Sequence, residues 1–443
     1  MPLVVAAAMF AAGMAFELLW IPVVYHQSRW FTQGDLWGML RAAHYVGWGD
    51  LGGIYTSGNG VVTFPGMAVL LAPVAMLSGA LHLTESYPGV YLTHPTAILL
   101  VLPVELVLAS SVVFAADALA QDLGVPRARR AWSCVLVAFL AWPTAVLWGH
   151  AEDALVMTLA LCAMRAASGG RWVRTGWLFG LAIVIQPLIA LVVPLYLAAS
   201  PPGRRLLFAV RCAALSAFTV GVAFLGNPSG TYRALVQQPT PPDINHPTPW
   251  VALAPKVVTP SNGIPQSSTG IPALGRGGFS TTSVVHHAAA NVSGGPGRTI
   301  DVLLAVVVAV YVWRRPQTPV RLLWLAAAVL ASRCFFEPVM TPYYLAPPLI
   351  LLVVLAARTD TRRLLPAGLV TVGVSSYAYL DVGRWVWWLP VVGGLSAVLA
   401  LTYPTVDRPV TGSEVDPPDR VVRSGSPGAP PGPVERDLVA SAG

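Results

Sequence analysis

The stretch LAIVIQPLIALVVP, residues 181–194, is apolar throughout except for Gln186, which stands directly before Pro187. It belongs to an apolar run over 175–199. An apolar run of about 18 residues or more is long enough to cross a lipid bilayer as a helix. Because proline removes a helical hydrogen bond and disfavours helix in the residue before it, the Gln-Pro pair predicts a break near the middle of this run.

The rest of the chain is similar in composition. Of its 443 residues, 55% are hydrophobic and 11% are charged, and the mean hydropathy is +0.64. Soluble domains carry about 25% charged residues. Further apolar runs lie at 3–24, 61–81, 95–117, 131–148, 152–167, 204–225, 300–313, 320–335, 342–357, 364–379 and 386–402. These runs predict an all-α, polytopic transmembrane helical bundle with about 10–12 membrane segments, including re-entrant or broken helices.

Arginine clusters between the apolar runs predict the topology. The clusters lie within 127–130, 165–174, 204–211, 314–321 and 358–363. By the positive-inside rule, we expect them and both chain termini on the cytoplasmic side of the plasma membrane. Arg174 and Arg204 then bring both ends of the run over 175–199 to that side, so we expect two short antiparallel or re-entrant helices, 175–186 and 187–199. One long kinked helix is the alternative interpretation.

The segments between and after the runs are predicted to be loops of three kinds. Residues 25–94 form a first external loop, in which 61–81 dips into the membrane surface and returns. Residues 227–298, which are rich in proline, form a second long external loop. The transmembrane domain covers 1–403, and 404–443 form a disordered cytoplasmic tail because they are rich in Pro, Gly, Ser, Asp and Arg.

Several classes of function find no support in the motifs. The chain has no Gly-rich phosphate loop, no basic stripe that suits nucleic acid, and no His or Cys spacing typical of a metal site. We therefore expect no nucleic-acid partner and have no reason to invoke a metal ion or another cofactor. The cysteines are expected to be small buried hydrophobes: Cys134, Cys162, Cys212 and Cys334.

The stretch over 30–60 carries two acids, Asp35 and Asp50, directly after the first apolar run. Apolar residues at helical spacing over 34–46 predict a surface helix. The stripe consists of Leu36, Met39, Leu40 and Ala43. Asp35 begins this helix, so its structural interpretation is an N-cap or first-turn acid. Asp50 either lines a site together with Asp35 or caps a turn.

Two later stretches bring ionisable groups to the external ends of apolar runs. They are WGHAEDAL, residues 148–155, and FFEPVMTPYY, residues 335–344. Their candidate binding residues are His150, Glu152, Asp153, Glu337, Tyr343 and Tyr344. Because ionisable groups at a bilayer boundary are costly unless paired or in a wet cavity, we expect these groups and Asp35 to share one cavity. For Glu152 and Asp153, the alternative is a stabilising role in the first turn of a helix.

Two further acids, Glu17 and Glu105, fall inside apolar runs. A carboxylate within the bilayer is costly unless it has a partner. Each of the two is therefore expected either to pair between helices or to mark a path through the bundle.

Three motifs in this order resemble those of the GT-C superfamily of polytopic membrane glycosyltransferases. The first is a first external loop with an early acid, followed by a membrane-skimming segment that reads Tyr55, then FPG at 64–66 and LLAP at 70–73. The others are WPTAVLWGHAEDAL over 142–155 and GWLFGLAIVIQP over 176–187. The chain looks most like bacterial mannosyltransferase-like members that use polyprenyl-phosphate sugars, and the resemblance covers roughly residues 1–400.

The resemblance implies inverting transfer of a sugar, with mannose expected, from a polyprenyl-phosphate donor to a lipid or cell-envelope polysaccharide acceptor at the outer membrane face. The family's first-loop acid maps onto Asp35, which implies that Asp35 is the general base. The leaving phosphate needs cationic or hydrogen-bonding partners. The candidates are Arg41, His150, Gln186 and Arg333. Relatives often place lysine near the helix break; Gln186 departs from this pattern, because glutamine can donate a hydrogen bond but cannot neutralise phosphate.

Two other functions fit the same composition. A membrane transporter or lipid flippase also uses broken helices, although transporters favour internally repeated halves and this chain shows no repeat. A non-catalytic membrane scaffold with the same fold would explain the departure at Gln186. The two long external loops favour an enzyme that handles a lipid-linked sugar.

Overall fold

The computed structural model describes residues 1–20, 30, 33–56, 60–85, 92, 94–242, 245–257 and 291–404. They belong to the first of two compact units, Met1–Thr405. The predicted tail over 404–443 lies, from residue 405 on, outside the described residues. The expected external loops over 25–94 and 227–298 are described in part.

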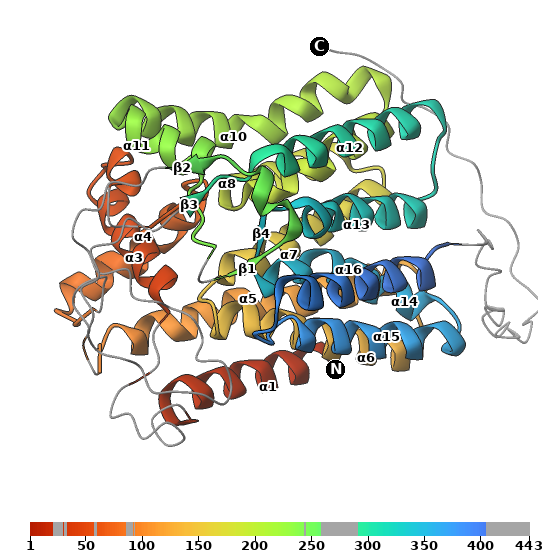
Figure 1. Cartoon of the computed structure of the whole chain (residues 1–443), viewed down its shortest axis with the longest axis horizontal. Coiled ribbons are helices and arrows are strands. Elements are labelled where there is room, and N and C mark those ends of the chain that lie inside the picture. The colour runs from red at the N-terminus through yellow and green to blue at the C-terminus, as the bar shows by residue number, and fades with distance from the viewer. Residues whose placement is uncertain are drawn as a thin grey trace, which may run out of the picture. The chain divides into compact units, whose positions relative to one another are not determined.

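The described part of the chain is built from helices, as predicted. The α-helices are α1 (Pro2–Ala15), α3 (Gly34–Gly47), α4 (Gly66–Ala80), α5 (Ile98–Asp122), α6 (Arg127–Val146), α7 (Ala151–Ser168), α8 (Trp172–Ile185), α9 (Val193–Ala199), α10 (Arg205–Gly226), α11 (Pro228–Tyr232), α12 (Gly295–Arg314), α13 (Pro319–Phe336), α14 (Ala346–Arg358), α15 (Thr361–Tyr377) and α16 (Arg384–Leu401). Turns of 3-10 helix lie at Gly52–Tyr55, Pro187–Val192, Pro202–Arg204, Pro249–Leu253 and Pro342–Leu345, and π-helical turns at Phe16–Trp20 and Arg233–Gln237. Helices α3, α4 and α11 lie together at one end of this bundle, and the turn from α12 to α13 lies at the other (Figure 1).

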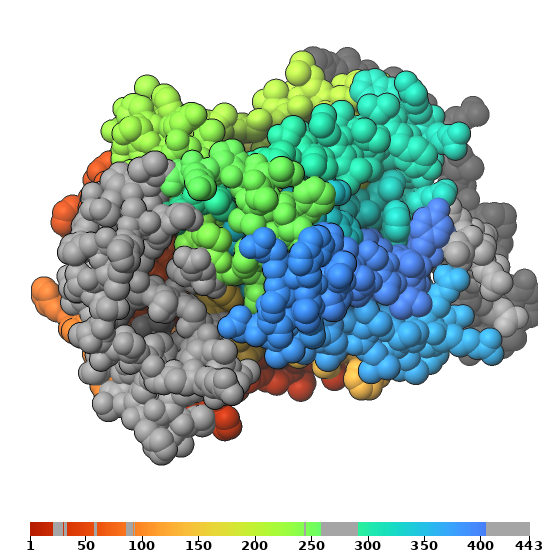
Figure 2. Space-filling model, viewed as in Figure 1, coloured from red at the N-terminus to blue at the C-terminus, as the bar shows by residue number. Residues whose placement is uncertain are grey.

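Among the residues that the structure describes, six helical segments are long and apolar enough to cross a membrane. They are Pro2–Trp20, Ile98–Asp122, Pro202–Gly226, Gly295–Arg314, Pro319–Phe336 and Arg384–Leu401. Shorter apolar helical segments lie at Gly66–Ala80, Trp172–Ile185, Pro187–Ala199 and Pro342–Arg358. Helices α12 and α16 lie at the surface in Figure 2, and α12 exposes large apolar side chains there, such as Leu303 and Val307. The fold is therefore consistent with a multi-pass membrane protein.

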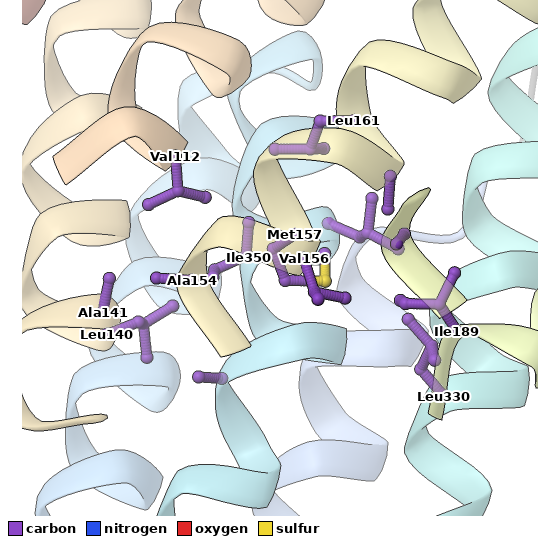
Figure 3. Close-up of a cluster of buried hydrophobic side chains, with 14 of the residues drawn as sticks. Val112, Leu140, Ala141, Ala154, Val156, Met157, Leu161, Ile189, Leu330 and Ile350 are labelled. Atoms are coloured by element: carbon purple, nitrogen blue, oxygen red, sulfur yellow. The ribbon is translucent and has the colours of Figure 1, made fainter. Parts of the chain in front are cut away.

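The core lies where α5, α6, α7, α13 and α14 meet. Figure 3 shows apolar side chains from all five helices directed into one cluster, among them Val112, Leu140, Met157, Leu330 and Ile350. Helix α14 is buried on every side from residue 346 to residue 357. A helix that is apolar all round is buried either in a protein core or in lipid, and α14 occupies the core of the bundle.

The break at Gln186 is present where the Gln-Pro pair predicts it. Helix α8 ends at Ile185, and Gln186 is extended, with φ −142° and ψ 113°. Pro187 then begins a 3-10 turn that leads into α9. The hydroxyl of Thr63 donates to the backbone carbonyl of Ile185 at 3.1 Å, so a carbonyl at the broken end of the helix has a partner.

The chain reverses direction after this break. The rings of Phe179 in α8 and Tyr196 in α9 lie 5.1 Å apart between centroids. Trp172 at the start of α8 and Ala199 at the end of α9 line the same cavity. The prediction of two short helices that return to one side is therefore confirmed, and the alternative of one long kinked helix is wrong.

The segment over 61–81 differs from its prediction. Instead of dipping and returning, residues Gly66–Ala80 form one continuous helix, α4, with Pro73 inside it. Its 15 residues span roughly 22 Å, less than the ~30 Å of a bilayer core. Met67, Leu71 and Ala75 are buried on one side of α4, which packs against α3. This packing offsets the hydrogen bond that proline removes.

Four two-residue strands depart from the all-α prediction. The strands β1 (His246–Pro247) and β4 (Val339–Met340) pair antiparallel, as do β2 (Lys256–Val257) and β3 (Asn291–Val292). Strands this short leave no alternating pattern in the sequence. The first pair joins the second long loop to the residues between Glu337 and Tyr343, and the Thr248 hydroxyl donates to the Glu337 carbonyl at 2.7 Å.

Gly66 at the start of α4 lies directly against the broken helix. A Cβ at this position would lie 2.4 Å from the carbonyl oxygen of Val184 and 2.8 Å from the backbone nitrogen of Ile185. We expect Gly66→Ala to lower the free energy of unfolding by about 1–3 kcal/mol, because the two backbones must separate. Gly373→Ala is the matched control, since a Cβ in the middle of α15 meets nothing within 4 Å. Thermal unfolding of the purified protein in detergent measures both, and equal midpoints for the two variants would contradict the close packing.

Candidate functional site

Asp35 lies in the first turn of α3, the predicted surface helix. The predicted apolar stripe is buried, with Leu36, Leu40 and Ala43 at 2%, 0% and 0% exposure, so the helix is held by its packed face. The Asp35 side chain is 58% exposed at the opposite side. Its Oδ2 lies 3.2 Å from Nε2 of His150, and its Oδ1 receives no hydrogen bond from the described residues.

His150 lies between two carboxylates in the turn from α6 to α7. Its Nδ1 is 2.5 Å from Oε1 of Glu152, which is nearly buried, while Nε2 faces Asp35. The imidazole also packs on the ring of Tyr343, with 4.6 Å between centroids. Gly149 makes this arrangement possible, because its φ is +69° and a Cβ there would lie 2.8 Å from Cβ of Gln33, just before α3.

The surroundings of His150 raise its pKa. Burial disfavours the charged imidazolium, but the carboxylates of Glu152 and Asp35 outweigh this effect, and the pKa lies well above the ordinary 6.5. His150 is therefore a cation at neutral pH that donates one hydrogen bond to each carboxylate.

This shift predicts how the stability contributed by His150 depends on pH. Because the folded pKa is raised, the contribution is fully present below pH 6.5 and is lost as the pH rises through the folded value. We expect the thermal midpoint of wild type to exceed that of His150→Gln by the largest margin below pH 6.5, and this margin to shrink above it. If the difference between the two thermal midpoints instead widens as the pH rises, His150 is neutral in the folded protein.

Gln186 and Asp153 join the helix break to the start of α7. Nε2 of Gln186 donates to Oδ1 of Asp153 at 3.0 Å. Thr63 donates to Oε1 of the same glutamine at 3.4 Å. Extended backbone at Gln186 directs its amide to Asp153, so the break in the helix contributes a side chain to the site.

Two arginines flank Glu337, whose side chain is 4% exposed. Nη2 of Arg298 lies 3.2 Å from Oε1, and Nε of Arg333 lies 3.7 Å from Oε2. The Arg333 guanidinium also stacks over the ring of Tyr344, 3.6 Å from its centroid. Tyr344 in turn contacts Tyr343 edge-on, with 4.9 Å between centroids. These contacts connect Glu337 to His150 through the two tyrosines.

We call the connected residues the polar cluster. They are Asp35, His150, Glu152, Asp153, Gln186, Arg298, Arg333, Glu337, Tyr343 and Tyr344. All but Arg298 are candidates from the sequence. Side chains from the three separate stretches contact one another here, and the cavity that they were expected to share stays a prediction. Arg298 belongs to no sequence motif. It is an isolated arginine at the end of the predicted second long loop, so the sequence gives no signal for it.

Two other candidates lie on or just after α3. Oδ1 of Asp50 accepts the backbone N–H of Gly53 at 2.9 Å, so Asp50 caps a turn, the second of its two interpretations. Arg41 lies on α3 about 120° around the helix axis from Asp35, at roughly 3.6 residues per turn, and its part in binding phosphate stays a prediction.

The two acids inside apolar runs lie beneath the polar cluster. Glu17 is fully buried and accepts a hydrogen bond from Nε2 of Gln33, which also donates to the carbonyl of Val146. Glu17 therefore has a hydrogen-bond partner, Gln33, in the segment that precedes α3. Glu105 is 2% exposed and lies near the carboxylate of Glu152 and the backbone N–H of Ala151 at the start of α7.

The cluster combines an exposed carboxylate with partly buried cations. The Asp35 side chain is 58% exposed, and its Oδ2 lies beside His150. His150, Arg298 and Arg333 supply positive charge among four carboxylates. Such a site can take a proton from a hydroxyl group and can hold a phosphate oxygen. The described residues include no group of three or more His, Cys, Asp or Glu arranged to hold a metal ion.

All four cysteines are free, and three of them are buried, as expected for small hydrophobes. No protein-family model matches the chain, and no curated protein is significantly similar to it in sequence.

Proposed function

We propose that this protein is an inverting membrane glycosyltransferase that moves a sugar, with mannose expected, from a polyprenyl-phosphate donor to a lipid or cell-envelope polysaccharide acceptor. The observation that carries the proposal is the contact between Asp35 and His150. It joins the acid of the first loop to the WGHAEDAL stretch, two of the features that carry the resemblance to GT-C enzymes. The exposed Oδ1 of Asp35 is available to an acceptor hydroxyl.

The reaction is a single displacement. The acceptor oxygen attacks the anomeric carbon of the sugar and forms the new C–O bond, while Asp35 takes the hydroxyl proton as general base. The bond between the anomeric carbon and the phosphate oxygen breaks at the same time, and its electron pair leaves with polyprenyl phosphate. Attack from the side opposite the leaving group inverts the configuration at the anomeric carbon.

The residues around Asp35 have distinct parts in this scheme. His150 positions Asp35 and is itself held by Glu152, because both ring nitrogens donate to carboxylates. Arg333 supplies the cation for the phosphate that leaves, and the amide of Gln186 supplies a hydrogen-bond donor. Tyr343 and Tyr344 separate His150 from Arg333 and form an apolar wall against which a sugar ring can pack.

The topology supports an outward site. The arginine clusters lie at the ends of the apolar helices that are remote from the polar cluster, since the cluster is at the start of α7 and Arg165 is in its last turn. By the positive-inside rule, the arginine end is cytoplasmic and the polar cluster faces the outside of the plasma membrane, with both termini inside. A lipid-linked sugar in the outer leaflet would reach Asp35 there.

The test uses the full chain in proteoliposomes with polyprenyl-phosphate mannose labelled in the sugar and an extract of cell-envelope glycolipid as acceptor. The expected result is label in a glycolipid product, absent from protein-free liposomes. Labelled donor that crosses the bilayer without transfer would replace the proposal with a flippase. If the label is neither transferred to a product nor moved across the bilayer, a scaffold remains as the function.

A further inference from the structure

A cavity of about 420 Å³ lies at the other end of the bundle from the polar cluster. Its walls come from the end of α7, the start of α8, the end of α9, the start of α10 and the turn between α12 and α13. The 18 residues of α7 separate it from His150 by roughly 27 Å, close to the thickness of a bilayer core. It is therefore a separate site at the opposite membrane boundary.

Arg205 is the charged residue of the cavity wall. Its Nη2 donates to the carbonyl of Ala198 at 3.2 Å and its Nε to that of Ser200 at 3.3 Å. The guanidinium also lies 4.1 Å from the centroid of the Trp313 ring. Because a guanidinium has five N–H groups, these contacts fix its position and leave donors for a ligand.

The electrostatic environment of the cavity favours an anion. Residues 154–242 and 302–336, which supply all of its walls, contain no Asp or Glu. The same turns carry further arginines at positions 171, 204, 314, 315 and 321. A concave site with charge of one sign around it concentrates ions of the opposite sign.

The surface next to Arg205 is apolar, which indicates an amphiphile. Leu206 is 78% exposed and Trp313 is 62% exposed, beside the cavity lined by Trp172. Tryptophans at this level and exposed leucines are typical of the boundary between head groups and acyl chains. An acyl chain would cover these side chains, whereas a water-soluble phosphate would not.

Gln317 adds an unpaired acceptor to the wall. Its Nε2 donates to the carbonyl of Arg315 at 2.6 Å, while its Oε1 is buried without a hydrogen-bond partner among the described residues. A buried acceptor without a partner is costly, so a ligand that supplies a donor gains affinity here. A head-group hydroxyl supplies such a donor.

We propose that this cavity binds the head group of an anionic glycerophospholipid, with the phosphate on Arg205 and a head-group hydroxyl on Gln317. The lipid bridges the start of α8 and the end of α9. It thereby holds together the two helices that return to the same side of the membrane after the break at Gln186.

Native mass spectrometry of the full chain in detergent measures this binding with phosphatidylglycerol, phosphatidylcholine and glycerol 3-phosphate as probes. We expect phosphatidylglycerol to bind at least about tenfold more tightly than phosphatidylcholine, a difference of about 1.4 kcal/mol. Both lipids carry the phosphate, but the quaternary ammonium of phosphatidylcholine is repelled by Arg205 and cannot donate a hydrogen bond to Gln317, whereas a glycerol hydroxyl can. Glycerol 3-phosphate tests the free head group. If it competes as well as the lipid, the site recognises phosphate alone and the lipid assignment is wrong.

Arg205→Gln is expected to abolish the preference for phosphatidylglycerol, whereas Arg362→Gln, in the first turn of α15 and outside the cavity, keeps it. Because Arg205 also holds the end of α9, a second variant, Ala199→Phe, fills the cavity and leaves Arg205 in place. Loss of the preference in both cavity variants supports the site. Equal binding of the two lipids by wild type, or an unchanged preference in Ala199→Phe, overturns it. No outcome depends on sugar transfer, so this site and the proposed function are tested separately.

Discussion

Asp35→Asn is expected to reduce sugar transfer by roughly 10²–10⁴-fold while the protein folds and accumulates normally. The amide keeps the size of the side chain and can still accept the hydrogen bond from Nε2 of His150, but it cannot take a proton from the acceptor. Because the Asp35 side chain is 58% exposed, its replacement leaves no buried group without a partner. The measurement is the initial rate of label transfer at equal protein level.

Asp50→Asn is the matched control for this variant. It also neutralises an exposed aspartate next to α3, and Asp50 caps a turn rather than joining the polar cluster. We expect its transfer rate to stay within about twofold of wild type, as for most surface substitutions. Equal rates for Asp35→Asn and wild type would remove Asp35 from catalysis, and equal losses in the two variants would point to a general effect of charge.

Glu337→Gln is expected to have the largest effect on stability, about 3–5 kcal/mol of the free energy of unfolding. The carboxylate is 4% exposed and lies between Arg298 at 3.2 Å and Arg333 at 3.7 Å. Removing its charge leaves the partly buried Arg298 and Arg333, whose side chains are 31% and 17% exposed, without their counter-ion. Denaturant titration of the protein in detergent measures the loss.

Asp122→Asn provides the comparison for a solvated ion pair. Asp122 binds Arg165 at 2.6 Å, but both side chains are 40% exposed. Water and salt screen such a pair, so we expect a loss of about 0–1 kcal/mol. A similar loss in Glu337→Gln and Asp122→Asn would mean that water reaches Glu337, and the polar cluster would then be an open surface rather than a built site.

Much of the fold can be predicted from the sequence, because both of its main signals are local. They are apolar runs long enough to cross a bilayer and residues that break helices. The run that contains residues 346–357 has no polar face, and it becomes the most buried helix of the bundle. Gln186 and Pro187 lie at a break that backbone chemistry favours, because proline removes a helical hydrogen bond and disfavours helix in the residue before it. The meeting of Asp35, His150 and Glu337 also follows, because all three lie at the same end of helices that alternate in direction.

The features that the sequence leaves open depend on distant contacts. Pro73 does not interrupt α4, because packing against α3 outweighs one lost hydrogen bond. Arg298 joins the site only through its contact with Glu337, which local spacing does not indicate. The paired strands require a register between residues far apart in the chain.

The anomeric configuration of the product tests the central claim most directly. Purified protein in proteoliposomes receives polyprenyl-phosphate mannose of one known configuration, and NMR or configuration-specific mannosidases identify the product. The account predicts the opposite configuration and one polyprenyl phosphate released for each sugar transferred, because the acceptor oxygen displaces the phosphate in a single step with Asp35 as base. A product of unchanged configuration, or sugar bound covalently to the protein, would contradict it.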